Sequence, residues 1–260
     1  MDLTWASLPE RALDQPRVAI LLCTFNGASY LKEQLNSIAA QTHTNTEIWA
    51  SDDGSTDQTK DILTRAQAAW GHDRVKIIEG PQQGFAGNFL FLTCHADIEA
   101  DYFAFCDQDD IWLPSKLTRA LSALSQLPKS SPTLYGSATQ LIDAKGRRVG
   151  VYSLNPRILS FQNALVQNFA SGNTMVFNNA LRDQVRSLGD QLRVVSHDWW
   201  LYLVATAIEG QVIFDQEPHI YYRQHREGQI GANAKPIQKL TRLKAMCTGR
   251  LLDWLQQNCI

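Results

Sequence analysis

Val18-Ala-Ile-Leu-Leu-Cys-Thr-Phe25 is a continuous apolar run, and Asn26-Gly27 turns the chain directly after it. Such a run is typical of a strand that is buried on both faces of a parallel sheet. Leu31, Leu35 and Ile38 then recur at helical spacing through Gln41. The sequence therefore predicts a buried strand followed by an amphipathic helix, which is the first half of a βαβ unit.

The same alternation of strand and helix continues to about residue 106. Further strands are predicted at 47–50, 75–78 and 102–106, with helices at 58–70 and from 84 to about 95. Strands that alternate with helices indicate an α/β fold with a Rossmann-like, mostly parallel sheet flanked by helices. We expect one domain over residues 1–234, with one half at about 17–128, a smaller mixed half at about 129–234, and a basic tail at 235–260.

The second half of the domain has a different pattern. Residues 133–143 and 147–152 are predicted to form a hairpin, followed by a short helix at 162–168 and a strand at 172–177. Helices are expected from Asn179 and from His197, with Ser196 as a plausible N-cap of the latter. Two short strands, 211–215 and 220–222, complete the prediction.

The composition limits the class of protein. The chain has 260 residues, 44% hydrophobic and 19% charged, with a net charge of −2, so no basic surface for nucleic acid is expected. Five scattered cysteines lack any C-x-x-C spacing, which indicates reduced thiols and no zinc site. No signal pattern is present, and the longest apolar runs are far too short to span a membrane. We therefore expect a cytoplasmic protein.

Polar clusters follow each of the first four predicted strands. In an open parallel sheet, ligands bind outside the carboxyl ends of the strands, so these clusters should meet at one edge. A shared edge favours a composed nucleotide-and-metal site over four unrelated turns. The clusters are Thr24-Phe25-Asn26, Asp52-Asp53, Gly84 to Asn88 (with Gly87), and Asp107-Gln108-Asp109-Asp110.

The last cluster is the candidate metal site. Asp107, Asp109 and Asp110 crowd like charges, which a fold retains when a cation lies between them or when water screens them. Mg²⁺ or Mn²⁺ suits one or two carboxylates together with phosphate oxygens. An acidic turn is the alternative. Likewise, Asp52 or Asp53 could accept the N3–H of a uracil or thymine ring, or could cap the next helix.

His197-Asp198 forms a second acidic centre at a helix start. Asp198 could act as a catalytic base, or it could simply be stabilised by the helix dipole. Trp199 and Trp200 could stack against a sugar or pack in the core. His225 follows the last strand and is either structural or a third metal ligand.

In this order and spacing, these motifs resemble the family-two glycosyltransferases, which are inverting enzymes of the GT-A fold. Within that family the chain looks most like the bacterial rhamnosyltransferase branch that builds O-antigen and related surface polysaccharides. The resemblance covers about Val18 to Gly231, and its later pieces are His197-Asp198-Trp199-Trp200 and Tyr222-Arg223-Gln224-His225. The departures are His197, where Glu is commoner, and Cys106, where Ser or Asp is more frequent.

The resemblance implies a role for each matching position. Asp198 would be the catalytic base, Asp109 and Asp107 the Mg²⁺ or Mn²⁺ ligands with His225 completing that site, and Asp52 would face the pyrimidine. His197, Trp199 and Trp200 would contact the acceptor, a glycan or lipid-linked glycan. The implied donor is dTDP-L-rhamnose or another dTDP- or UDP-sugar, bound by Thr24, Phe25, Asn26, Asp52, Asp53, Gly84, Gly87, Asn88, Asp107 and Gln108.

Other interpretations stay open at this point. A sugar-nucleotide pyrophosphorylase uses a similar sheet but needs basic residues just after the first strand, where none occurs before Lys32. A catalytically silent sugar-nucleotide-binding protein of the same fold is a second alternative. The basic tail could lie on an anionic membrane, which would place the protein at the inner face of the cytoplasmic membrane, or it could dock as a terminal helix.

Overall fold

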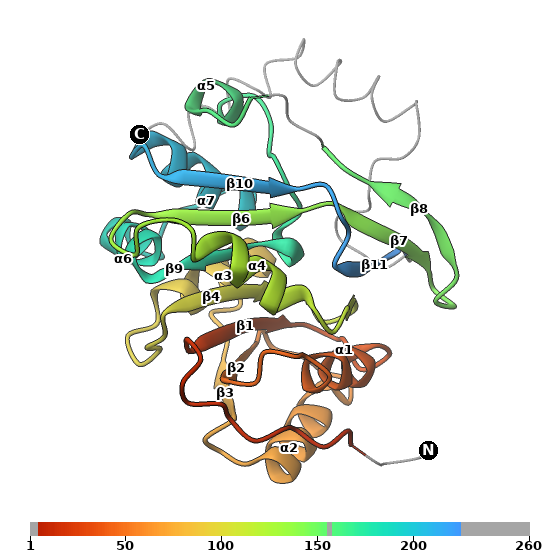
Figure 1. The fold of residues 1–260 in the computed structure, drawn as a ribbon. Coiled ribbons are helices and arrows are strands. Elements are labelled where there is room, and N and C mark those ends of the chain that lie inside the picture. Colours follow the sequence, from red (N-terminus) through yellow and green to blue (C-terminus); the bar gives the residue numbers. More distant parts are fainter. Residues whose placement is uncertain (1–4, 155–157, 225–260) are drawn as a thin grey trace, which may run out of the picture.

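The structure, a computed structural model, describes residues 5–154 and 158–224; the predicted basic tail and His225 lie outside these residues. A seven-stranded sheet has the order β10-β6-β9-β4-β1-β2-β3 (Figure 1). In that order its strands are Gln211–Asp215, Thr133–Ser137, Val176–Asn178, Tyr102–Cys106, Val18–Thr24, Thr46–Asp52 and Val75–Glu79. A four-stranded sheet, β5-β11-β7-β8, comprises Ile111–Trp112, Ile220–Gln224, Thr139–Asp143 and Arg148–Tyr152.

The large sheet is mostly parallel, as the sequence predicted. Strand β1 pairs in parallel with both β2 and β4, and β2 pairs in parallel with β3. Strand β9 runs antiparallel to its neighbours β4 and β6. The register sets Thr24 beside Asp52 and Leu22 beside Cys106, so β1, β2 and β4 end at nearly the same level. The polar residues that follow these strands therefore emerge at one edge.

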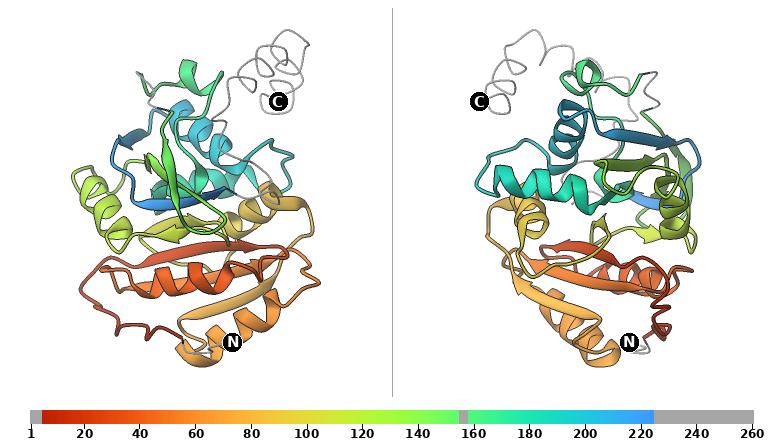
Figure 2. Two further views of the ribbon diagram at one scale, coloured as in Figure 1. Left: turned by 90° about the vertical axis from the view of Figure 1, so that its right-hand side faces the viewer. Right: turned by 60° about the vertical axis from the view of Figure 1, so that its left-hand side comes forward.

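Helices cover both faces of the sheet (Figure 2). One face carries α1 (Leu31–Ala39), α2 (Thr59–Trp70) and α4 (Lys116–Leu124). The other carries α3 (Gly84–Cys94), α6 (Asn179–Leu188) and α7 (His197–Ala207). Among the described residues no helix has the length and apolar character needed to cross a membrane.

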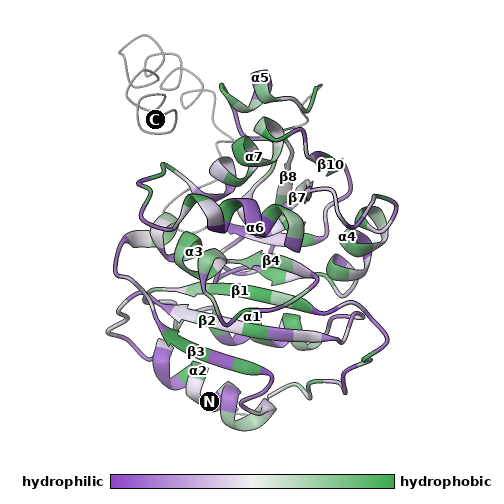
Figure 3. Cartoon of the chain, turned by 90° about the vertical axis from the view of Figure 1, so that its left-hand side faces the viewer, coloured by the Kyte–Doolittle hydropathy of each residue, from purple (hydrophilic) through white to green (hydrophobic). Residues whose placement is uncertain are grey.

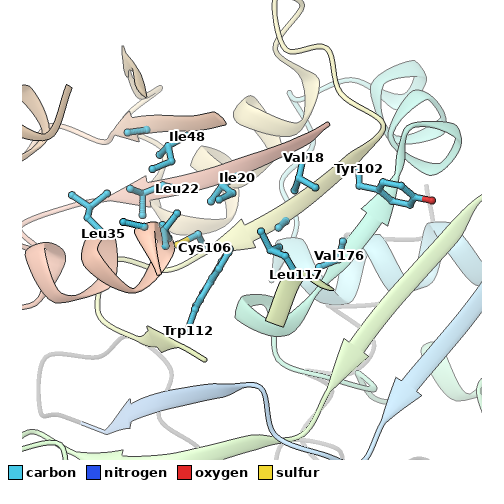
Figure 4. Packing of buried hydrophobic residues seen from close by; sticks show 14 of the residues in the cluster. Val18, Ile20, Leu22, Leu35, Ile48, Tyr102, Cys106, Trp112, Leu117 and Val176 are labelled. Atoms are coloured by element: carbon cyan, nitrogen blue, oxygen red, sulfur yellow. The ribbon is translucent and has the colours of Figure 1, made fainter. Parts of the chain in front are cut away.

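The two faces explain the continuous apolar sequence of β1, which is hydrophobic along most of its length (Figure 3). Side chains alternate along a strand, so Val18, Ile20 and Leu22 pack under α1 (Figure 4). Ala19 and Leu21 pack under α3 and α7. Because both faces are buried, neither set can be polar, and the usual alternation of an exposed strand disappears.

Three predictions in the second half need correction. The segment 133–143 is not one arm of a hairpin, because the chain leaves the large sheet at Ala138 and β7 enters the small one. Only β7 and β8 form the expected antiparallel pair. Residues 172–174 form a 3₁₀ helix, with β9 beginning at Val176, and the short helix α5 spans only Phe161–Ala164. Strand β5 and helix α4 were not predicted.

A buried arginine closes the end of α3. Arg182 on α6 is 2% exposed; its Nε donates to the carbonyl of Thr93 (2.8 Å) and its Nη2 to that of His95 (2.6 Å). The guanidinium also lies 4.7 Å from the centre of the Phe103 ring. Thr93 lies in the last turn of α3 and His95 is its C-cap, where helix carbonyls have no intrahelical donor. Arg182 therefore joins α3 and α6 on one face of the sheet.

We expect Arg182→Met to lower the free energy of unfolding by about 1–3 kcal/mol, because it leaves the buried carbonyl of Thr93 without a donor and the half-buried carbonyl of His95 with only the Ile98 N–H at 3.4 Å. Arg186→Met is the matched control, since Arg186 makes only an exposed pair with Asp183 at 3.9 Å and should cost less than about 0.5 kcal/mol. Urea unfolding followed by circular dichroism measures both. Equal losses in the two variants would contradict the role given to Arg182.

Candidate functional site

A cavity of about 610 Å³ opens at the carboxyl ends of β1 and β4, between the start of α3, the start of α7 and the end of β11. Most of the predicted site residues line it. They are Thr24, Phe25, Asn26, Asp53, Gly84, Asn88, Asp107, Gln108, Asp109, His197 and Asp198. Residues from all four predicted clusters and from the later acidic centre are thus brought to one cavity.

Asp107 and Asp109 form the acidic wall of the cavity, while Gln108 between them turns back toward β1. The Gln108 amide accepts from the backbone N–H of Phe25 and donates to the Phe25 carbonyl, both at 2.9 Å. Burial, together with the negative charges of Asp109 and Asp198, raises the pKa of Asp107 to about 8. A bound cation would remove this repulsion.

The residues fit a divalent ion only as part of a larger coordination shell. Within residues 5–154 and 158–224, no group of three His, Cys, Asp or Glu side chains is arranged to hold a metal ion. Asp107 and Asp109 could supply one or two carboxylates, with phosphate and water oxygens completing the octahedron that Mg²⁺ prefers. The predicted ligand His225 lies outside the described residues.

Behind Asp107 and Asp109 lie two buried ionisable residues, Asp110 and Lys116, whose burial was not predicted from the sequence. Asp110 is 0% exposed, and burial raises its pKa well above the usual range. Lys116 is 2% exposed, and its ammonium lies 3.5 Å from the centre of the Trp112 ring. Burial lowers the pKa of Lys116 to about 7, opposed by the charges of Cys106, Asp110 and Asp107. The acidic wall is therefore backed by a buried lysine whose amine interacts electrostatically with Asp107 and Asp110.

Asp52 and Asp53 are adjacent, but the structure gives them different surroundings. Asp52 is not part of the cavity wall; it accepts hydrogen bonds from Thr24 Oγ1 (2.9 Å) and from the N–H and hydroxyl of Ser55 (2.9 and 2.5 Å). Asp53 does line the cavity, and it accepts the backbone N–H groups of Gln82 (2.6 Å) and Gly84 (2.9 Å). The geometry thus favours Asp53 over Asp52 for contact with a ligand.

Other residues that were predicted to bind the sugar donor make hydrogen bonds within the protein that hold the cavity wall in place. Asn26 has φ of 48° and accepts the backbone N–H of Thr56 through its side chain (2.8 Å). Asn88 is 1% exposed and exchanges two hydrogen bonds with Ser51 at the end of β2. Gly84 lines the cavity with φ of 78°, whereas Gly87 does not line it.

Asp198 lies on the cavity wall in the first turn of α7. Its Oδ2 accepts the N–H of Gly172 (3.0 Å), and its Oδ1 accepts the N–H of Trp199 (2.7 Å) and the hydroxyl of Ser196. Ser196 occupies the N-cap position as predicted, although its side chain contacts Asp198 instead of a helix N–H. Burial raises the pKa of Asp198 to about 6, against the effect of the backbone N–H donors. A base with this pKa can accept a proton near neutral pH.

The three predicted acceptor residues are placed differently. His197 borders the cavity, but its ring stacks on Phe89 at 3.9 Å, and burial lowers its pKa to about 3. Trp199 and Trp200 do not line the cavity and pack against the core. Trp199 Nε1 donates to the carbonyl of Ala164 at 2.7 Å. Acceptor contact through these tryptophans stays a prediction that this geometry does not favour.

Several cavity residues were not among those predicted. Tyr222, Arg223 and Gln224 come from the end of β11, and Gly172 from the 3₁₀ turn. The first three follow the rule that polar residues at strand ends bind ligands. They belong to the motif Tyr222-Arg223-Gln224-His225, in which a role was predicted only for His225, and β11 extends through Gln224, two residues beyond the predicted end at Tyr222.

Comparison with known sequences identifies a family for most of this region. Residues 19–185 match the family model described as glycosyl transferase family 2. The chain is 29% identical over 244 residues to the dTDP-rhamnosyl transferase RfbG of Shigella flexneri, covering 85% of this chain and 78% of that protein. It is 38% identical over 103 residues to an uncharacterized glycosyltransferase of Nostoc, covering 40% and 31%.

Solved structures show the same fold. The TarS 1–349 structure from S. aureus in complex with UDP-GlcNAc has a TM-score of 0.60 and 19% identity, over 88% of this chain and 66% of that one. The mannosyltransferase PcManGT from Pyrobaculum calidifontis, in complex with GDP-Man and Mn²⁺, has a TM-score of 0.58 and 19% identity, over 95% and 68%. At this identity the likeness concerns the fold alone, and it confirms the GT-A type predicted from the sequence.

Gly172 should tolerate no side chain. A Cβ there would lie 2.8 Å from His197 Nε2 and 3.0 Å from the Cβ of Asp198. Because the His197 ring is fixed by stacking, we expect Gly172→Ala to lower the free energy of unfolding by about 1–3 kcal/mol. Urea unfolding measures the loss, and adding His197→Ala should recover part of it. A Gly172→Ala variant as stable as the parent would show that the contact is not tight.

Proposed function

The chain belongs to glycosyl transferase family 2, and on this premise we propose that it transfers a sugar from a nucleoside diphosphate donor to an acceptor hydroxyl with inversion of configuration. The observation that carries this proposal is the shared cavity: Asp107 and Asp109 line one part of its wall and Asp198 another. One group of carboxylates can hold the cation of a diphosphate, while a separate carboxylate remains to act as a base. A purely structural acidic turn would need no such arrangement.

The donor would lie along the carboxyl ends of β1 and β4. Asp53 is suited to accept a pyrimidine N3–H or ribose hydroxyls, because its carboxylate borders the cavity. Phe25 is 49% exposed at the same wall and offers a flat apolar face to a base. A Mg²⁺ or Mn²⁺ ion, when bound, would neutralise charge on the departing diphosphate. Asp107 and Asp109 would hold that ion.

Asp198 would perform the proton transfer. As the acceptor hydroxyl attacks the anomeric carbon, its proton passes to a carboxylate oxygen of Asp198, and the bond to the diphosphate breaks with its electron pair leaving on the diphosphate. The attack comes from the face opposite the leaving group, so a β-linked donor gives an α-linked product. The N–H groups of Gly172 and Trp199 fix the carboxylate in place for this step.

We propose dTDP-β-L-rhamnose as the donor and a hydroxyl of a glycan or lipid-linked glycan in bacterial surface polysaccharide synthesis as the acceptor. The resemblance to the S. flexneri dTDP-rhamnosyl transferase over 85% of this chain supports rhamnose. Another UDP- or dTDP-hexose is the alternative, since the TarS neighbour was solved with UDP-GlcNAc. The residues that line the cavity fit either class of sugar.

The proposal is tested by incubating the protein with a panel of nucleotide sugars, each with Mn²⁺ or with EDTA, and following diphosphate release and donor binding. Release with dTDP-L-rhamnose and Mn²⁺ alone would establish the donor and the cation. Asp109→Ala should weaken donor binding only in the presence of Mn²⁺. Absence of both binding and release for every sugar would overturn the proposal and favour a silent protein of this fold.

We expect Asp198→Asn to reduce kcat by about 10²–10⁴-fold, because the amide cannot accept the acceptor proton. Donor affinity, measured by calorimetry with Mn²⁺, should stay near the parent value. Near-normal turnover in this variant would remove Asp198 from the role of base.

The pH dependence of kcat/KM should reflect the ionisation of Asp198. Asp198 must be ionised to act, and its pKa lies at about 6. At saturating Mn²⁺, which keeps Asp107 ionised, kcat/KM should therefore be constant above this pH and fall about tenfold per unit below it. A limb near pH 4 would instead indicate a solvent-exposed carboxylate or a different base.

A further inference from the structure

The 3₁₀ turn Gly172–Thr174 lies between the acidic loop after β4 and the start of α7, and it contacts both. Asn173 Nδ2 donates to Asp110 Oδ2 at 2.5 Å. The next residue toward the N-terminus, Gly172, donates its backbone N–H to Asp198 Oδ2 at 3.0 Å. Two consecutive residues thus link a carboxylate beside the proposed donor site to the proposed base.

Both side-chain oxygens of Asp110 accept hydrogen bonds inside the protein. It is 0% exposed and is not among the residues that line the cavity. Its second oxygen, Oδ1, accepts the backbone N–H of Arg223 at 3.1 Å. The partner Asn173 is itself 1% exposed. Asp110 therefore lies off the cavity wall with both of its oxygens hydrogen-bonded, although it is adjacent in sequence to Asp109.

The turn is also held at its far end. Thr174 Oγ1 accepts the backbone N–H of Ser137 at 3.1 Å and donates to the carbonyl of Ser171 at 2.7 Å. The Met175 carbonyl accepts the N–H of Phe105 on β4 at 3.2 Å. Asn173 therefore lies between these fixed contacts and Gly172, whose own carbonyl accepts the N–H of Met175 at 2.8 Å.

Resting on the proposed function, we propose that Asp110 is a positioning residue for the base. Through Asn173 it holds the Gly172 N–H against Asp198, and so sets where the base stands relative to Asp107 and Asp109. A carboxyl group suits this task because its two oxygens accept from two donors, Asn173 Nδ2 and Arg223 N, whereas an asparagine there would offer a single acceptor oxygen.

The sequence allows a direct test that needs neither donor nor acceptor. Ser171-Gly172 is the single Ser-Gly pair of the chain, which has 15 glycines. Labelling serine at its carbonyl with ¹³C and glycine with ¹⁵N therefore isolates one amide signal, that of Gly172. In the parent protein this signal should move with pH as Asp198 titrates, and the movement should vanish in Asp198→Asn. Asp107, Tyr222 and the neighbouring His197 are the other ionisable groups near Asp198.

In Asn173→Ala and in Asp110→Asn, the Gly172 signal should lose most of its pH-dependent movement. The matched control is Asn178→Ala, which removes a buried asparagine (5% exposed) beside Tyr102 at the opposite end of β4. It should lower stability without changing the Gly172 titration. An unchanged Gly172 titration in Asn173→Ala would overturn the proposal, and so would an equal change in Asn178→Ala.

Assays of sugar transfer distinguish a failure of the positioning role of Asp110 from a failure of the proposed function. If the parent transfers sugar, Asn173→Ala should lower kcat by about 10–100-fold, as for a misplaced catalytic group, with donor KM unchanged. A loss of Mn²⁺ affinity in Asp110→Asn equal to that in Asp109→Ala would make Asp110 a metal ligand and overturn the positioning role. If the parent transfers nothing, the proposed function fails, while the Gly172 titration still decides whether Asp110 and Asn173 fix Asp198.

Discussion

Repulsion between carboxyl groups at the end of β4 is the constraint on which the cavity depends. Asp107 and Asp109 face the cavity, and Asp110 lies buried behind them. Burial and mutual repulsion raise the pKa of both Asp107 and Asp110. The protein meets this constraint in two ways. Asn173 and the Arg223 backbone donate to the buried carboxyl, which also interacts electrostatically with Lys116, while a cation bound with substrate would serve the pair in the cavity.

Segments far apart in the chain are needed to hold this arrangement. Arg223 on β11 donates its backbone N–H to Asp110, its Nε to the carbonyl of Asp109 (2.9 Å) and its Nη2 to Glu33 on α1 (2.5 Å). The 3₁₀ turn from residue 172 supplies the remaining donor. The acidic loop is consequently fixed by elements from the start, middle and end of the described chain. This arrangement allows one cavity to present the proposed cation site and the proposed base together.

Much of the fold followed from the sequence because buried parallel strands leave a simple pattern. The apolar run of β1 and the exact span of β4, Tyr102–Cys106, were predicted from residues alone. The errors fall where pairing decides the structure. Nothing local marks Ala138 as the point where the chain leaves one sheet for another, since that change depends on the partners β9, β10, β8 and β11. Short elements such as β5 have too few residues to show a repeating pattern of apolar side chains.

The sequence by itself determined the order of the elements from β1 to β4, the strand ends there that carry polar residues, and the family. The tertiary structure alone decided which member of each adjacent pair reaches the cavity: Asp53 and not Asp52, Asp109 and not Asp110, Asp198 and not the tryptophans after it. The physical reason is that the direction of a side chain at a strand or helix end is fixed by its hydrogen-bond partners. For Asp110 and Asp198 these include residues more than twenty positions away in the chain, such as Asn173, Arg223 and Gly172.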